Sequence, residues 1–571
     1  MYAFFLGSSE AVPLKETVVR TVRWVKWSVS QVKTRERLYA VPICMTSPKP
    51  QGFENGDKTT GGCSSLPHPA TDGGKTQSPD GPTVAEHTMD ICIIGGGVSG
   101  LSALQVIMGT PQYKSGLWRP TLFEARDKTG GIWYSAPPDT ADPPLTPTYD
   151  SLTTNLPHPI MSYAAFPFPP STPVYPRAKV VEDYLDSFVA HFDLSTNIRL
   201  NTTVEHLERD ETNSFWRIRT SGPGCGRGWV RFHKVVVANG RFRFPRFPNV
   251  PGLDDWLEAG KATHSAWYRR PADHGSAVLV VGGGYSGRDI STEIAGLHST
   301  TVVYLSVSEL PFDPPRSSKV QYRSRLVELL PFNKQGRGKV RYEDGTEDEV
   351  DSCILATGYK MVLPFLSGPL IQTSLPPTPI PPVANDKLYN STYHIFPLIK
   401  HLFPGTDKYP PTSLAFPGLL FRVSPLPFVE AQAHLMVKLW TSPELLNVDA
   451  EVDLLVSRYK MLKDRLAGDE LQVAKRYFTF EPHEQFQYRD EFYTLIYGDD
   501  EETLKKYITP NWHEKMYLNT SLLRAEWEEM ERTGEAKEFV KGVGEGSRDE
   551  WEKLMHKLLD RALEKLDIQN R

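Results

Sequence analysis

The chain has 571 residues, of which 39% are hydrophobic, and a formal net charge of -5. This length predicts about three or four domain-sized units, and the charge gives no global attraction to nucleic acid or to an anionic membrane surface. The five cysteines have no CxxC or metal-ligand spacing. This argues for a reducing compartment and against a disulfide scaffold or a redox dithiol. No apolar stretch reaches the roughly 18 residues that a membrane span requires.

Residues 1–88 differ in composition from the rest of the chain. Valines and tryptophans are interspersed among the basic residues between Lys15 and Arg37, a pattern that suits either an amphipathic membrane-surface or transit-like helix or a dispensable extension. From Ser47 to Thr88 the chain is rich in Gly, Ser, Thr and Pro, which predicts a disordered linker. We therefore expect a disordered, low-complexity extension over 1–88 and a cytoplasmic protein. The basic stretch leaves peripheral membrane association open.

A glycine-rich turn follows the first predicted strand. Ile91–Ile94 is a short apolar run typical of a buried parallel strand, and a helical pattern begins near Leu101. Between them, glycines at GxGxxG spacing allow a tight turn, a close approach of the backbone to a pyrophosphate, and close helix–strand packing. The predicted dinucleotide contacts here are Gly95, Gly97, Val98, Ser99 and Gly100.

The next predicted strand, Pro120–Glu124, ends in an acid. A carboxylate about 20 residues after such a turn is the acceptor that a ribose hydroxyl pair needs. Glu124 is therefore predicted to bind a ribose, and the alternative is an ordinary strand-end acid.

Two segments after Glu124 resemble those of a known family. Glu124, Gly130, Gly131 and Trp133 stand at Glu-x5-Gly-Gly-x-Trp spacing, which resembles the FAD-binding segment of flavin-containing monooxygenases. Ser151–Asn155 and Phe166–Pro169 resemble the family's SLxTN and FPFP segments. The resemblance implies that Gly131 and Trp133 contact FAD and that Asn155 lies beside the reactive edge of the flavin. Without the resemblance, Asn155 would be a turn residue before Pro157.

The resemblance continues toward the middle of the chain. Ala178–Phe192 has helical periodicity, and Ile198–Leu207 and Phe215–Thr220 are predicted strands. The family implies that the backbone of Val204 faces the adenine. Val235–Gly240 resembles the family's first joint between domains, and Gly260–Tyr268 matches its FxGxxxHxxxW fingerprint in part. We expect His264 to be a linker or positioning residue, not an acid.

A second glycine turn follows the apolar strand Ala277–Val281. Two such turns are far more specific than one and imply one site for a flavin and one for a nicotinamide. An NADP 2′-phosphate needs a cation or a hydroxyl near the next strand end, whereas NAD needs an acid. This chain has Ser306, Ser308 and Glu309 there, and Arg316 and Lys319 later. NADPH is implied by the resemblance, and strictness for NADPH over NADH stays open. The predicted NADP contacts are Gly282, Gly284, Tyr285, Ser286, Gly287 and Ser306.

The last third contains further matches and a charged tail. Lys339–Gly345 is a predicted hairpin turn, and Ala356–Tyr359 resembles the family's second joint. Pro411–Leu420 and Pro427–Ala433 resemble the strand and helix that cover the flavin, which implies Gln432 as an FAD contact. The tail contains one helical stripe that we expect to be a packing face: Trp551, Leu554, Met555, Leu558, Leu559, Ala562, Leu563 and Leu566.

Together the motifs predict an α/β fold with two Rossmann-like dinucleotide-binding domains and parallel sheets. The predicted organisation is an FAD domain formed by 89–244 and 356–500, an inserted NADPH domain over 245–355, and a charged helical extension over 501–571. No metal-site motif or nucleic-acid signal is present.

The resemblance implies an NADPH-dependent monooxygenase. NADPH reduces FAD, O2 adds as a C4a-hydroperoxide, and an amine nitrogen or a sulfur of a small molecule accepts the oxygen. The alternatives are a Baeyer–Villiger-type ketone monooxygenase and, from another class, a non-catalytic flavin and NADP redox sensor. The sequence leaves the substrate and the oligomeric state, including a homo-oligomer, open.

Overall fold

The computed structural model describes residues 88–569, except 140, 211, 213, 227, 273, 311–318, 367, 379–386, 407 and 409. The predictions for residues 1–87, including the basic stretch, and for Arg316 lie outside the described residues.

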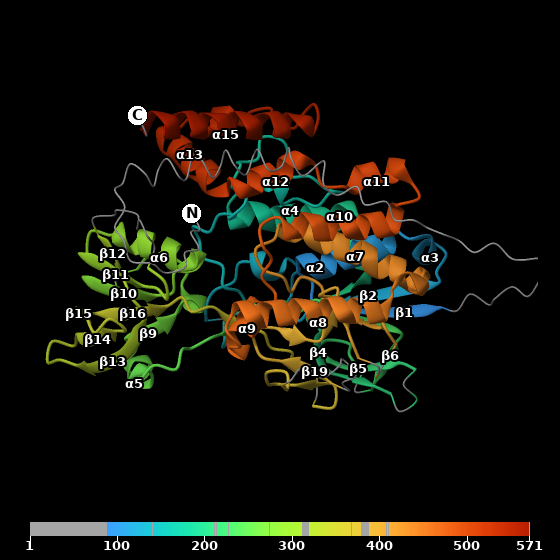
Figure 1. Cartoon of the computed structure of the whole chain (residues 1–571), viewed down its shortest axis with the longest axis horizontal. Helices are drawn as coiled ribbons and strands as arrows, with labels where there is room; N and C mark the ends of the chain where they lie inside the picture. The colour runs from blue at the N-terminus through green and yellow to red at the C-terminus, as the bar shows by residue number, and fades with distance from the viewer. Residues whose placement is uncertain are drawn as a thin grey trace, which may run out of the picture. The chain divides into compact units, whose positions relative to one another are not determined.

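The first sheet is parallel and has the strand order β23-β7-β1-β2-β3. Its central strand β1 carries Ile91, Cys92 and Ile93, which are fully buried, because both faces of the sheet are covered. Helix α2 packs against α7 beside this sheet (Figure 1). The sheet thus joins the beginning of the described chain to a strand more than 300 residues later. Its elements are β1 Met89–Ile94, α2 Val98–Met108, β2 Trp118–Phe123, β3 Ile198–Arg199, β7 Lys234–Val237, β23 Leu414–Ala415 and α7 Pro425–Thr441.

The second sheet is also parallel, with the order β12-β11-β10-β16-β9. Helix α6 packs against β10 and β11, and an antiparallel sheet β13-β14-β15 follows, whose hairpin confirms the predicted turn near Gly345. The elements are α5 Leu253–Glu258, β9 Ala262–His264, β10 Ala277–Val281, α6 Tyr285–Ala295, β11 Val302–Ser306, β12 Val320–Arg323, β13 Leu326–Phe332, β14 Gly338–Tyr342, β15 Glu347–Val350 and β16 Ser352–Leu355.

The chain passes between the two sheets twice, and the two passages pair. Strand β8 (Phe244–Pro245) runs antiparallel to β17 (Tyr359–Lys360). The Arg246 N–H donates to the Gly358 carbonyl at 2.9 Å, and the Thr357 hydroxyl donates to the Arg246 carbonyl. The second predicted joint therefore pairs with residues 244–246, which follow the first predicted joint, in one two-stranded connection.

The remaining strands form small sheets, and most of the remaining helices follow β23. The strands are β4 Thr203–Arg209, β5 Trp216–Ser221, β6 Val230–Phe232, β18 Ile371–Gln372, β19 Leu388–Asn390, β20 Ile395–Phe396, β21 Leu398–Ile399 and β22 Phe403–Pro404. The helices are α3 Pro111–Lys114, α4 Ala178–His191, α8 Val448–Arg465, α9 Glu470–Arg476, α10 Glu484–Tyr497, α11 Glu501–Tyr507, α12 Asn511–Leu518, α13 Thr520–Thr533, α14 Ala536–Phe539 and α15 Asp549–Gln569.

Two predicted elements need correction. Ile198–Leu207 is not one strand: β3 ends at Arg199 and pairs with β2, whereas β4 begins at Thr203 and pairs with β5. The stripe on α15 packs through Trp551, Leu558 and the other residues up to Ala562, but Leu563 and Leu566 are 40% and 38% exposed. Helical periodicity predicts which face of a helix is apolar, but it does not predict how far along the helix the neighbouring elements cover that face.

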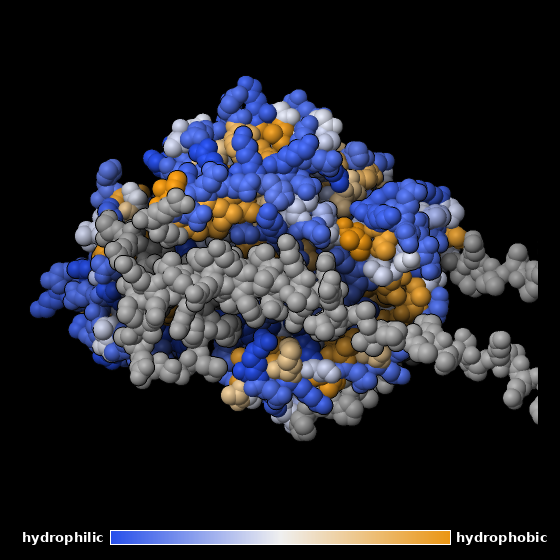
Figure 2. Space-filling view, turned by 45° about the horizontal axis from the view of Figure 1, so that its top comes forward, coloured by the Kyte–Doolittle hydropathy of each residue, from blue (hydrophilic) through white to orange (hydrophobic). Residues whose placement is uncertain are grey.

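Figure 2 shows hydrophilic side chains over most of the coloured part of the face, with apolar side chains in smaller separate patches. Within the described ranges, no helix is both long and apolar enough to cross a membrane. Cys92 and Cys353 lie buried in β1 and β16, as predicted, and burial raises the pKa of both thiols.

Candidate active site

The first glycine turn leaves no room for side chains at two of its positions. Gly95 has φ +105, and a Cβ there would lie 2.5 Å from the Ala238 carbonyl oxygen. A Cβ on Gly100 would lie 1.9 Å from the Gly95 carbonyl oxygen. The backbone of the turn therefore approaches both its neighbouring strand and its own helix closely, as the spacing predicts.

The Gly130–Trp133 segment contacts this turn directly. The Gly130 N–H donates to the Gly96 carbonyl at 2.9 Å, and a Cβ on Gly131 would lie 2.8 Å from the Gly97 Cα. Gly131–Trp133 forms a single 3-10 turn. The two predicted FAD segments are thus one backbone surface.

Glu124 is buried beside the same turn. One carboxylate oxygen accepts from the Gly96 N–H at 2.7 Å, and the other accepts from the Arg126 N–H at 3.0 Å. The Arg126 guanidinium pairs with the Glu124 carboxylate at 3.1 Å and donates to the Gly131 carbonyl at 2.8 Å. Arg126 was not predicted as a site residue, although a cation two positions after a strand-end acid is a usable signal.

The N-terminus of α2 meets two further segments. The Val98 carbonyl accepts from the Tyr163 hydroxyl at 2.6 Å. Ser99 faces the turn at Gly418, where a Cβ would lie 2.3 Å from the Ser99 hydroxyl oxygen. Val204, the predicted adenine neighbour, is buried in β4.

The side chain of Gln432, a predicted FAD contact, is bonded within the protein. It is fully buried on α7. Its amide oxygen accepts from the Gly418 N–H at 2.9 Å, and its amide nitrogen donates to the Tyr488 hydroxyl at 3.2 Å. Gln432 therefore holds the Gly418 turn, and its contribution to the site passes through that turn to Ser99.

Asn155 is half-buried in a segment that pairs with the residues leading into α4. The Thr154 N–H donates to the Pro176 carbonyl at 3.0 Å, and the Ala178 N–H donates to the Leu152 carbonyl at 2.8 Å. These bonds hold the backbone on the N-terminal side of Asn155, which itself lies in a bend.

The second glycine turn has the same geometry. Gly282 has φ +118, and a Cβ on Gly287 would lie 1.8 Å from the Gly282 carbonyl oxygen. Gly284, Tyr285 and Ser286 are exposed, and a Cβ on Gly284 would meet no atom within 4 Å. The open end of α6 is accessible to a ligand.

Ser306, a predicted NADP contact, is bonded within the second domain. Its side chain is 2% exposed. Its hydroxyl donates to the Ser324 carbonyl and accepts from the Leu326 N–H, both at 2.9 Å. The hydroxyl joins β11 to β13 and is not placed to meet a 2′-phosphate. Lys319 lies at the opposite end of β11 and donates to the Leu297 carbonyl at 2.9 Å.

His264 lies at the connection between the sheets. Its Nδ1 accepts from the Ala266 N–H at 3.1 Å, so Nε2 carries the proton and donates to the Gly358 carbonyl at 3.0 Å. Burial lowers the pKa of His264 to about 4. The ring is neutral near pH 7, which suits a positioning role better than that of an acid.

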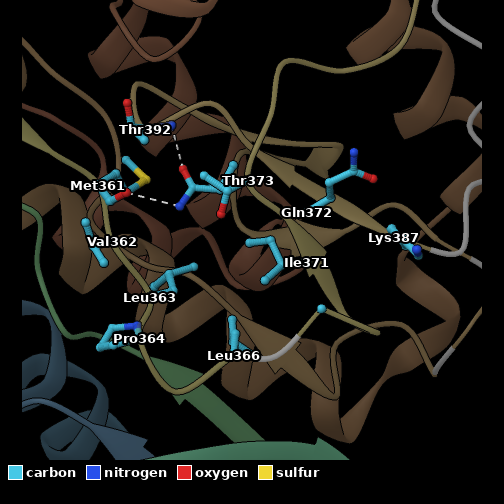
Figure 3. A pocket seen from close by; sticks show the side chains of 12 residues that line it. Met361, Val362, Leu363, Pro364, Leu366, Ile371, Gln372, Thr373, Lys387 and Thr392 are labelled. Atoms are coloured by element: carbon cyan, nitrogen blue, oxygen red, sulfur yellow. Dashed lines mark hydrogen bonds between the residues drawn. The ribbon is translucent and has the colours of Figure 1, made fainter.

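A cavity of about 590 Å³ lies beside the second joint. Figure 3 shows Met361, Leu363, Leu366 and Ile371 around it. The Asn390 amide donates to the Met361 carbonyl at 3.0 Å and accepts from the Thr392 N–H at 2.8 Å. None of the residues predicted to bind FAD or NADP lines this cavity.

Residues 88–327 match the family described as "Flavin-binding monooxygenase-like". Flavin-containing monooxygenase FMO GS-OX5 of Arabidopsis thaliana is 30% identical over 330 residues, which cover 52% of this chain and 68% of the relative. The thiol-specific monooxygenase of Saccharomyces cerevisiae is 30% identical over 364 residues, or 61% of this chain and 76% of the relative.

The fold resembles a solved structure along most of its length. The S-allyl-L-cysteine S-oxygenase of Allium sativum superposes with a TM-score of 0.62 at 24% identity, covering 84% of this chain and 99% of the other. The two parallel sheets with their glycine turns thus define a fold with two Rossmann-like domains.

The chain belongs to the flavin-containing monooxygenase family. It is a flavin-dependent monooxygenase whose cofactors are FAD and NADPH.

Proposed function

We propose that this enzyme oxygenates the nitrogen or sulfur of small soft nucleophiles by the C4a-hydroperoxyflavin route. The position of the Asn155 segment carries the proposal. Tyr149, the first residue of the segment 149–161 that carries Asn155, donates to Asp289 on the helix after the second glycine turn. Soon after its end, Tyr163 donates to Val98 in the first turn. One short segment thus extends from one predicted cofactor site to the other.

The residues at both turns suit the phosphates of the cofactors. Gly97 and Gly284 are the N-cap residues of helices α2 and α6, and neither helix has a side-chain cap or an acidic residue in its first turn. Their free N–H groups and positive ends suit an anion. FAD would lie on Gly95–Gly100, Gly131–Trp133 and Val204, with its ribose on Glu124. NADP would lie on Gly282–Gly287.

The protein's part in the reaction is orientation and exclusion of water. When bound, NADPH supplies a hydride and FAD activates O2. The side-chain amide of Asn155 would hydrogen-bond to the reacting edge, and no protein nucleophile is required. Among the described residues, no group of three or more His, Cys, Asp or Glu could hold a metal ion.

The domain organisation is also a proposal. We assign 89–244 and 356–500 to FAD, 245–355 to NADPH and 501–571 to a helical extension. The first sheet supports this division because it combines β1 with β23, and so does the second sheet, whose strands all lie between Ala262 and Leu355. Free Cys92, Cys225 and Cys353 favour a reducing, cytoplasmic location.

The names of two relatives favour sulfur as the oxygenated atom, since one is called thiol-specific and the other acts on S-allyl-L-cysteine. A panel of sulfides, thiols, amines and ketones, with oxygen uptake and product recorded after NADPH addition, tests the proposal. Substrate-dependent uptake with S- or N-oxygenated product supports it. A flavin that NADPH does not reduce would refute it, and lactone or ester products from ketones would favour the Baeyer–Villiger alternative.

Asn155→Ser tests the assigned residue. The shorter side chain loses the amide at the reacting edge, so FAD should stay bound while oxygenation falls about 10²-fold, as loss of one such donor costs. The fraction of NADPH consumed to give hydrogen peroxide should rise. Asn519→Ser is the matched control, because that amide donates to the Lys515 carbonyl within the C-terminal helices. An unchanged product yield in Asn155→Ser would contradict the role.

A further inference from the structure

The segment that carries Asn155, residues 149–161, contributes side chains to three separate apolar clusters. Tyr149 packs with Val278 and Ile290 behind the second sheet. Ile160 packs with the helices of the C-terminal extension. Met161 packs in the large core around the first sheet. Side chains of this segment are therefore anchored in three clusters, which together hold the backbone that carries Asn155.

Polar contacts anchor the beginning of this segment to α6. The Tyr149 hydroxyl donates to the Asp289 carboxylate at 2.5 Å, and the Ser151 hydroxyl donates to Glu293. The Tyr268 hydroxyl also donates to Glu293. Both carboxylates belong to the helix that follows the second glycine turn.

The C-terminal extension contacts the same segment at Thr153 and Thr154, the two residues before Asn155. From α13, the Arg524 guanidinium donates to the Thr154 carbonyl at 2.8 Å and to the Thr153 hydroxyl at 2.9 Å. The Thr154 carbonyl belongs to the peptide group that joins Thr154 to Asn155. Arg524 thus contacts a peptide group of which the Asn155 nitrogen is a member.

Arg524 is itself held in place. Its Nε pairs with Glu528 one turn later on α13 at 2.8 Å, and its guanidinium lies over the Tyr175 ring, 5.5 Å from the centroid. The Tyr175 hydroxyl donates to the Thr520 carbonyl at 3.3 Å. A planar guanidinium with several donors in fixed directions is well suited to hold a peptide in one orientation.

Arg524 also faces the charges of α6. Its positive charge opposes the effect of burial on Asp289, whose pKa burial raises, and it favours the ionised form of Tyr149 as well. The negative charge of Glu528 adds to the rise in the pKa of Asp289. The helix of the NADP turn and the C-terminal extension therefore approach the Asn155 segment together.

We propose that Arg524 is a positioning residue for the oxygenation step, holding the Thr154–Asn155 peptide from the C-terminal extension so that the Asn155 amide points to the reacting edge. This rests on the proposed role of Asn155. The proposal gives a function to the C-terminal extension, which contains none of the cofactor motifs.

Arg524→Gln and Arg524→Lys test the proposal, with Arg532→Gln as the matched control. Arg532 is on the same helix and pairs with Glu529 on the surface, with its side chain 71% exposed. In Arg524→Gln we expect kcat for oxygenation to fall about tenfold, the scale of loss for a misplaced group, while KM for NADPH changes little. Arg524→Lys keeps a charged donor and should recover part of the loss. Arg532→Gln should behave as wild type.

Two measurements separate positioning from a merely structural role. Amide hydrogen exchange should rise in residues 149–161 of Arg524→Gln but not in β10. In the Asn155→Ser background, adding Arg524→Gln should lower kcat by less than about twofold, because both changes act on one group. Additive losses, or unchanged exchange in the segment, would overturn the proposal.

The exchange measurement requires no turnover and keeps the two proposals distinguishable. If Asn155→Ser leaves the product yield unchanged, the role of Asn155 fails, whereas the exchange result still decides whether Arg524 restrains the segment. If Asn155→Ser behaves as expected and Arg524→Gln behaves as Arg532→Gln, only the inference about Arg524 fails. If Arg524→Gln does not fold, Arg524→Lys provides the same comparisons.

Discussion

At the scale of single residues, Gly284 and Gly287 of the second glycine turn differ in why a side chain is unfavourable there. A Cβ on Gly287 would overlap the Gly282 carbonyl oxygen at 1.8 Å, whereas one on Gly284 would meet nothing within 4 Å. The φ of Gly284 is -70, which any residue can adopt. Gly287 is therefore required by the fold itself, and Gly284 only by a ligand that approaches the backbone.

This difference gives a paired prediction. Gly287→Ala should destabilise the protein by about 1–3 kcal/mol, because backbone atoms must move to admit the methyl group. Gly284→Ala should leave the melting temperature unchanged and raise KM for NADPH. Thermal unfolding and steady-state kinetics of both variants check this, and equal melting temperatures for the two would contradict it.

At the scale of elements, helix α15 is a packing helix along only part of its apolar stripe. Leu558 is fully buried against the neighbouring extension helices, whereas Leu563 is 40% exposed. Trp551 at the start of the helix packs edge-on against His158, with ring centroids 4.3 Å apart. The extension thus contacts the segment that carries Asn155 through His158.

Leu558→Ala should therefore cost about 2–5 kcal/mol of unfolding free energy, the usual loss for a fully buried leucine. Leu563→Ala lies on the same stripe and should stay within about 0.5 kcal/mol of wild type. Urea unfolding of both variants measures this difference. Similar losses in both would show that the stripe packs along its whole length.

At the scale of the whole molecule, buried neutral histidines make the stability depend on pH. Burial lowers the pKa of six of them to about 3 or 4, namely His158, His264, His394, His401, His434 and His513. In the unfolded chain these imidazoles bind protons near pH 6.5, whereas in the folded protein they stay neutral down to about pH 4. The stability that each neutral histidine contributes is therefore fully present above pH 6.5 and is lost as the pH falls below it. Two carboxyls whose pKa burial raises, Glu430 and Asp289, act in the opposite direction.

We expect the free energy of unfolding to fall steeply from pH 6.5 toward pH 4, by about 1.4 kcal/mol per pH unit for each histidine. His513→Leu should make this dependence shallower by one proton and leave the stability at pH 7.5 nearly unchanged. Urea unfolding at several pH values measures both slopes. Equal slopes in variant and wild type would contradict the assignment for His513.

The sequence by itself determined the two nucleotide turns, the strands before them and the helices after them. Turn geometry is local: three glycines within six residues fix the backbone path whatever surrounds it, as the close contacts at Gly100 and Gly287 show. The buried face of Ala178–His191 and the hairpin at Gly345 were predictable for the same reason, since periodicity and turn residues act over a few positions.

Only the tertiary structure decided where side chains point and what they meet. Ser306 and Gln432 lie in predicted segments, yet Ser306 bonds to another strand and Gln432 to the Gly418 turn and α10. Arg524 reaches Thr154 across 370 positions of sequence. Such contacts depend on how distant elements pack, which no local pattern encodes.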